Sequence, residues 1–169
     1  MSLLSSAIHG TSFHVQDPSR AESVVPFGWG LAITGFREDD LEGPWLWVHA
    51  AIPTPAIWDW YGREVDLGVR LAEVSVRFDS SEGHFWIANL HVWAAGNRLA
   101  NLDGLQRPQK PDSEFRHNFG VELPVKVTGT AINLSIGIEQ PRLIVVHRRP
   151  LAPTFVFNEA SANFVVSER

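Results

Sequence analysis

The chain has 169 residues, enough for one domain whose core needs no metal or disulfide to support it, and we expect a single domain over 1–169. It contains no cysteine, which excludes a disulfide framework, a thiolate metal site and a cysteine nucleophile. The net charge of -5, with lysine only at positions 110 and 126, argues against a nucleic-acid partner, because such binding needs a basic surface. No secretion signal or apolar run of about 20 residues is found, so we expect a cytoplasmic location and no membrane partner.

Helical periodicity is scarce, and the chain is predicted to be all-β. Strands are expected over 13–16, 27–35, 45–52, 71–78, 85–94, 99–102, 119–127, 131–138, 143–146 and 160–166. The stretch 61–71 is interpreted as a connection into a strand, and 106–114 as a mobile surface loop. About ten short strands, with glycine and proline in the turns, predict a single antiparallel β-sandwich, jelly-roll-like, with a closed β-barrel as the alternative.

Two of these strands share an unusual pattern. In 45–52 and in 85–94, aliphatic residues alternate with aromatic or hydrogen-bonding residues, so each strand has one ordinary core face and one face that is a candidate ligand surface. The candidate ligand residues on this second face are Trp47, Asn89 and Trp93, beside the histidines His49 and His91. Whether the two histidines share a site depends on strand neighbours that the sequence does not specify.

The seven tryptophans are the outlier in composition. A large aromatic core is one explanation, and a face that stacks a sugar or another apolar ring is the other. The proline-stiffened loop 52–61 adds further ligand candidates at Trp58, Asp59, Trp60 and Tyr61. The same aromatic loop is also suited to a protein interface, which we favour, so we expect a homo-oligomer and specifically a dimer.

Metal and acid–base chemistry are both considered for the histidines. His49 and His91 could bind a metal with Glu73 or Glu139, but no H-x-H or H-x-x-x-H string is present, so we expect no metal and no cofactor. In an enzyme, His49, His91 and Glu73 would be the acid and base groups. Glu73 followed by Arg77 is equally typical of a solvated row of charges. The glycines of 28–30 are interpreted as a bulge or a close approach of strands.

Several short strings in this order span most of the chain: 7–10 (AIHG), 27–30 (FGWG), 47–55 (WVHAAIPTP), 89–93 (NLHVW), 103–105 (DGL) and 162–164 (ANF). Together they resemble a family of small uncharacterised bacterial all-β proteins. The most specific string runs from His49 to Pro55. The resemblance implies a compact β-sandwich and supplies no activity, and the insert 58–61 is not associated with that family.

These observations favour a non-catalytic binding or assembly module that recognises a small molecule, a glycan or a protein subunit through the aromatic loop and the histidine-bearing face. The alternative is a small β-sandwich or barrel enzyme, cyclase-like or isomerase-like, acting on a hydrophobic substrate. The two functions differ in how far the ligand site should be enclosed by the protein. A deep apolar cavity with convergent polar groups favours the enzyme, whereas a filled core with an exposed aromatic surface favours binding or assembly.

Overall fold

The computed structural model describes residues 2–36, 45–55, 69–80, 86–105, 113–118, 125–127, 130–139 and 154–166. These residues form strands and two single-turn 3-10 helices, η1 (Gly10–Ser12) and η2 (Pro18–Arg20). The strands are β1 (Ser2–His9), β2 (His14–Val15), β3 (Ala21–Phe27), β4 (Gly30–Phe36), β5 (Trp45–Pro53), β6 (Val69–Ser80), β7 (Trp86–Ala94), β8 (Asn97–Leu102), β9 (Ser113–Asn118), β10 (Val125–Lys126), β11 (Ala131–Glu139) and β12 (Thr154–Val166).

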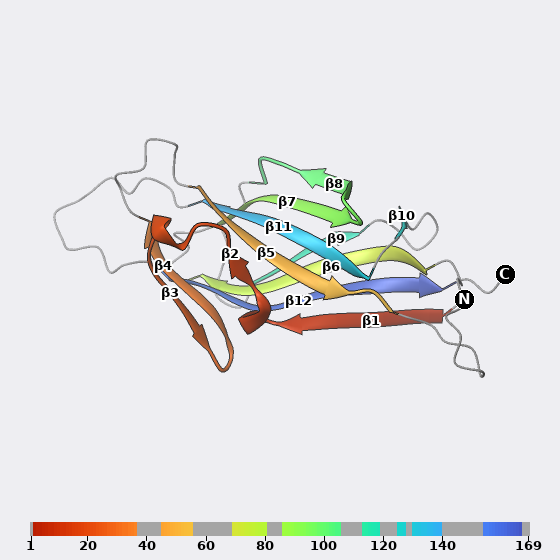
Figure 1. Cartoon of the computed structure of the whole chain (residues 1–169), viewed down its shortest axis with the longest axis horizontal. Coiled ribbons are helices and arrows are strands. Elements are labelled where there is room, and N and C mark those ends of the chain that lie inside the picture. The colour runs from red at the N-terminus through yellow and green to blue at the C-terminus, as the bar shows by residue number, and fades with distance from the viewer. Residues whose placement is uncertain are drawn as a thin grey trace.

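The strands form two antiparallel sheets that pack face to face (Figure 1). The seven-stranded sheet has the order β10-β6-β12-β4-β3, with β1 also paired to β12 and β9 to β6. The five-stranded sheet has the order β2-β5-β11-β7-β8. The predicted β-sandwich is therefore confirmed, and the described strands do not close into the barrel considered as its alternative.

Strict alternation of apolar and polar residues explains how the two sheets make one core. On β11, Ile132, Leu134, Ile136 and Ile138 are all fully buried, and their neighbours along the strand point to the opposite face. Burial of each such side chain stabilises the fold by about 1.5–3 kcal/mol. The interior is also where phenylalanines gather: five of them are buried there, Phe13, Phe78, Phe155, Phe157 and Phe164.

The described tryptophan side chains lie elsewhere. Trp47 and Trp93 are half-buried on an outer face, and Trp29 is 56% exposed. The prediction of an aromatic core is thus correct for phenylalanine, whereas these three tryptophans lie at the surface.

Two predictions about local structure are wrong. The predicted strand 27–35 begins too early, because β3 ends at Phe27 and β4 begins at Gly30, so Gly28 and Trp29 form a hairpin turn in place of a bulge. The close approach expected here does occur at Gly30, where a Cβ atom would meet the carbonyl oxygen of Phe157. The second error concerns 106–114, since β9 begins at residue 113.

Other predicted segments fall partly or wholly outside the described residues, namely 61–68, 106–112, 119–124 and 143–146. Of the predicted strand 119–127, the described part contains β10, which pairs with β6. In the part of the chain that the structure covers, no helix is long and apolar enough to cross a membrane.

Candidate functional site

The outer face of the five-stranded sheet carries the histidines and tryptophans of the predicted ligand surface. On β5, Val48 is fully buried, whereas Trp47 and His49 point to the other side and keep part of their surface in solvent. On β7, His91 and Trp93 are likewise partly exposed. The two-faced character expected for both strands is therefore present in the structure.

A row of polar side chains crosses this face from edge to edge. Ser135 on β11 is opposite His49 on one side and opposite His91 on the other. The row continues outward to His14 on β2, opposite His49, and to Asn101 on β8, opposite His91. Neighbouring strands are about 4.8 Å apart, so the backbones of His49 and His91 are separated by about 10 Å with Ser135 between them. The two histidines share one surface.

Hydrogen bonds fix the His49 ring from both sides. Its Nε2 lies 3.2 Å from Gln16 Oε1, and its Nδ1 lies 3.1 Å from Ser135 Oγ. An amide oxygen only accepts, so Nε2 carries the proton and the Ser135 hydroxyl donates to Nδ1. Burial lowers the pKa of His49 below its ordinary value of 6.5, and His14 lowers it further. At neutral pH this ring is therefore uncharged.

His91 is held by a carboxylate at the rim of the face. Its Nε2 donates to Asp103 Oδ1 at 2.8 Å, and Asn101 donates to the other carboxylate oxygen at 2.7 Å. The hydrogen bond from His91 is the largest reason that the pKa of Asp103 is lowered from 3.8. Asn89 points at the same turn, where its amide can accept from the Gly104 N–H at 3.3 Å or, in the reversed orientation, donate to Asp103 at 3.0 Å. The rim therefore offers an ionised, partly exposed acceptor.

The two tryptophans lie on either side of His91. The ring centroid of Trp47 is 5.0 Å from that of His91, and the ring centroid of Trp93 is 6.5 Å from that of His91. Trp47 reaches across β11 because Gly137 has no side chain there: a Cβ atom on Gly137 would lie 3.4 Å from the Trp47 ring. The guanidinium of Arg98 lies 5.5 Å from the centre of the Trp93 ring. We define the His/Trp face as Trp47, His49, Ser135, His91 and Trp93.

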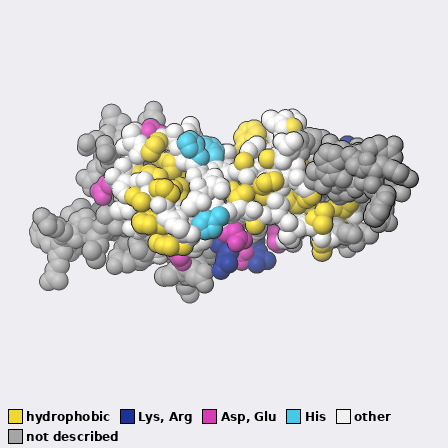
Figure 2. All heavy atoms as spheres, turned by 60° about the horizontal axis from the view of Figure 1, so that its bottom comes forward, with side chains coloured by type: hydrophobic (Ala, Val, Ile, Leu, Met, Phe, Trp, Pro, Cys, Tyr) yellow, Lys and Arg dark blue, Asp and Glu magenta, His cyan; other side chains and the backbone are white. Residues whose placement is uncertain are grey.

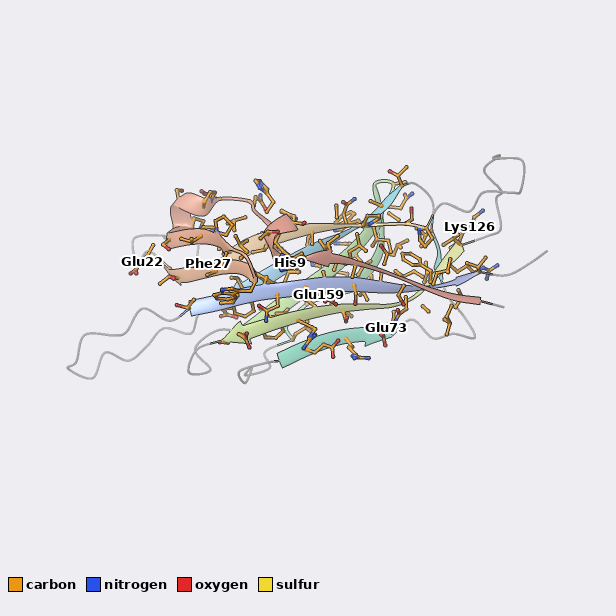
Figure 3. All side chains as sticks on the ribbon, turned by 90° about the horizontal axis from the view of Figure 1, so that it is seen from below. His9, Glu22, Phe27, Glu73, Lys126 and Glu159 are labelled. Carbon is orange, nitrogen blue, oxygen red and sulfur yellow. The ribbon has the colours of Figure 1, made fainter. Side chains whose placement is uncertain are left out.

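Glu73, the third group of the acid–base set expected in an enzyme, lies on the opposite side of the sandwich. On β6 its neighbour Val74 is fully buried between the sheets, so Glu73 points outward from the seven-stranded sheet (Figure 3). There it accepts a hydrogen bond from Asn163 at 3.0 Å and lies 3.7 Å from Arg116. The structure thus does not bring Glu73 together with His49 and His91, because the whole core separates them.

The position of Glu73 on the other sheet also removes it from the metal site considered from the sequence with His49 and His91. Glu139 is on β11, on the same side as Ser135, but roughly 13 Å further along the strand. Among the described side chains, no group of three His, Cys, Asp or Glu residues is close enough to hold a metal ion.

The outer face of the seven-stranded sheet contains a shallow polar depression of about 430 Å³. The hydroxyls of Ser75 and Ser161 meet at 2.7 Å in its centre. Longer charged or amide side chains surround them: Glu73, Arg77, Glu114, Arg116, Glu159 and Asn163. This is a solvated row of charges, which was the alternative interpretation of Glu73 and Arg77, and it lacks the apolar walls that a hydrophobic substrate requires.

Some residues of the site were not predicted from the sequence, and some predicted site residues lie outside the described residues. Gln16, Arg98, Asp103 and Gly137 were not predicted for the site, since their roles depend on which strands are neighbours. The loop candidates Trp58, Asp59, Trp60 and Tyr61 lie outside the described residues.

No protein-family model and no curated protein matches this chain, so the family resemblance stays a prediction. Among solved structures, the chain is similar to a xylan-binding module, CBM15, with 7% identity, a TM-score of 0.49 and 99% of both chains covered. It is also similar to a family two carbohydrate esterase from Cellvibrio japonicus, with 8% identity and a TM-score of 0.38, covering 99% of this chain and 37% of that one. At these identities and TM-scores, neither similarity assigns a function to the chain.

Proposed function

We propose that the protein is a non-catalytic binding module that holds a glycan on the His/Trp face. The observation that carries this proposal is the row of hydrogen-bonding groups between two tryptophans on an open sheet surface. Tryptophan offers a broad apolar ring on which the C–H face of a sugar can stack. Histidine, serine and carboxylate groups beside it supply donors and acceptors for sugar hydroxyls.

The open shape of the site favours binding over catalysis. Asp103 keeps 55% of its side chain exposed, so water is not excluded from the polar groups as acid–base catalysis normally requires. Apart from Ser80, the side chains that point between the sheets on the described strands are apolar, and they pack into one cluster where a hydrophobic substrate would need space. These features match the filled core and exposed aromatic surface expected for a binding module.

The proposal is tested by electrophoresis through gels that contain soluble polysaccharides, followed by calorimetry on the polymer that retards the protein. Trp47→Ala and Trp93→Ala should each weaken binding by about tenfold or more, which corresponds to about 1.4 kcal/mol of lost stacking. Trp29→Ala is the matched control, since Trp29 is 56% exposed but lies in the β3–β4 turn. Equal affinity in all three variants, or no retardation by any of a broad panel of polymers, would contradict the proposal.

A further inference from the structure

The strand β1 forms a sheet edge of a kind that soluble proteins normally protect. Among the described strands it pairs only with β12, over eight consecutive positions with no register shift. Its sequence, SLLSSAIH, contains no proline and no Asp, Glu, Lys or Arg. A long, regular, uncharged edge exposes backbone N–H and C=O groups that can pair with another strand.

The other edge strands among the described residues have features that discourage such pairing. β3 contains Glu22 and Pro26, and β8 contains Arg98. β9 contains Glu114 and Arg116. The remaining ones, β2 and β10, have only two residues each. Charge, proline and short length are the usual protections of a sheet edge, and β1 has none of them.

Apolar side chains are also exposed along this edge. Leu3 is 65% exposed and Leu4 is 36% exposed, although residues opposite them on β12, Val165 and Phe164, are buried. Figure 2 brings the lower side of Figure 1, where β1 lies, toward the viewer. One cluster of blue and magenta atoms lies below the centre, further magenta atoms lie apart from it on the left, and much of the rest of the described surface is yellow or white.

We propose that β1 pairs antiparallel with β1 of a second copy of the chain, which joins two seven-stranded sheets into one. The second copy is the favoured occupant because β1 is complementary to itself when run antiparallel: Leu4 and Ile8 are symmetric about Ser6, and the strand carries no carboxylate that would meet its own copy in a chain with a net charge of -5. The new backbone hydrogen bonds and the burial of two leucines per copy then stabilise the pair.

Symmetry restricts how the two strands can align. A two-fold axis that makes neighbouring strands antiparallel is perpendicular to the sheet and lies between them, so each residue keeps its side-chain direction and one residue lies opposite its own copy. An axis at Ser6 places Leu4 of one copy against Ile8 of the other. Both residues are opposite fully buried positions of β12, Phe164 and Ala160, so this register extends the core of each copy across the boundary.

The experiment measures mass in solution and cross-linking. The parent should have the mass of two chains in sedimentation or light scattering, and Leu3→Lys should yield folded single chains, since this side chain is mostly exposed within one copy. Val25→Lys is the matched control: Val25 is 39% exposed on the protected edge strand β3, and its substitution should leave the mass unchanged.

The absence of cysteine from the chain gives a second readout. Ser6→Cys should form an intermolecular disulfide on mild oxidation, because the symmetry axis brings the two sulfur atoms together. Ser23→Cys on the exposed part of β3 should not. A parent that remains a single chain at high concentration overturns the proposal, and so does a dimer that persists in Leu3→Lys and fails to cross-link through Ser6→Cys.

Discussion

Gly137 allows the Asn89 and Trp47 side chains to lie close to β11 on the His/Trp face. A Cβ atom at this position would lie 2.9 Å from the amide nitrogen of Asn89 and 3.4 Å from the Trp47 ring. A strand interior normally disfavours glycine, so its presence in β11 is explained by the close approach of these two side chains. An added Cβ atom would therefore press on Asn89 and fill the space beside the Trp47 ring.

We predict that Gly137→Ala displaces Trp47 and Asn89, at a cost of about 1–3 kcal/mol in the free energy of unfolding. The near-ultraviolet circular dichroism of tryptophan should change, and glycan affinity should fall. Gly28→Ala is the control, because no atom lies within 4 Å of a Cβ atom there. Identical spectra and affinities for the two variants would show that Trp47 does not depend on this space.

A second residue-scale prediction concerns the carboxylate at the rim. The hydrogen bond from His91 is the largest cause of the lowered pKa of Asp103, ahead of the one from Asn101. His91→Ala should therefore raise the Asp103 pKa toward 3.8, and Asn101→Ala should raise it less. A carbon-13 NMR titration of the aspartate carboxyl measures both. The reverse order would mean that His91 does not hold Asp103 in solution.

At the scale of the elements, strand alternation is the property most readily tested by mutation. Val74 on β6 is fully buried, and Val74→Asp places an unpaired carboxylate in the core, which costs several kcal/mol. Leu134→Asp on β11 should do the same. Arg77→Ala, at an exposed position of β6, should change stability by no more than about 0.5 kcal/mol. Thermal unfolding compares the three, and a parent-like melting curve for either aspartate variant would contradict the observed register.

The same alternation explains how far the sequence alone could predict the fold. In β11, and over 46–52 of β5 and 72–78 of β6, every second residue is apolar, so these strands and their buried faces were predictable. β1 and β3 were missed because they belong to sheet edges, where serine or charge interrupts the pattern. The strand predicted for β4 begins at Phe27, three residues before Gly30, because apolar residues continue through the β3–β4 turn.

Strand order is the part of the site that local patterns do not encode. His49 and His91 meet at Ser135 because β11, much later in the chain, inserts between β5 and β7. The same non-local arrangement sends Glu73 to the opposite face, since β6 belongs to the other sheet although it lies between β5 and β7 in sequence. The alternation of residues predicts which face of a strand each side chain occupies. Which residues share the site depends on how distant strands pair, and the sequence pattern does not show this.

For the whole molecule, His49 links folding to pH. Burial lowers its folded pKa below 6.5, so between that folded value and 6.5 the unfolded chain binds more protons than the folded chain. Its contribution to stability is therefore fully present above 6.5 and is lost as the pH falls through the folded pKa. We predict that the melting temperature falls from about pH 8 to about pH 5 and that His49→Gln reduces this slope. His9→Gln, which replaces an exposed histidine of β1, is the control, and equal slopes in both variants would exclude His49 as the cause.

The unprotected edge of β1 has a consequence for how tightly a polymer is held. A two-fold axis perpendicular to the seven-stranded sheet leaves both five-stranded sheets on the same side of the joined sheet, so the two His/Trp faces point in one direction. A long chain of repeated sugar units can then contact both faces at once, and the second contact benefits from a high effective concentration. Avidity would increase without any new contact within either copy, and Leu3→Lys would lose it on polymers while keeping the parent's affinity for short oligosaccharides.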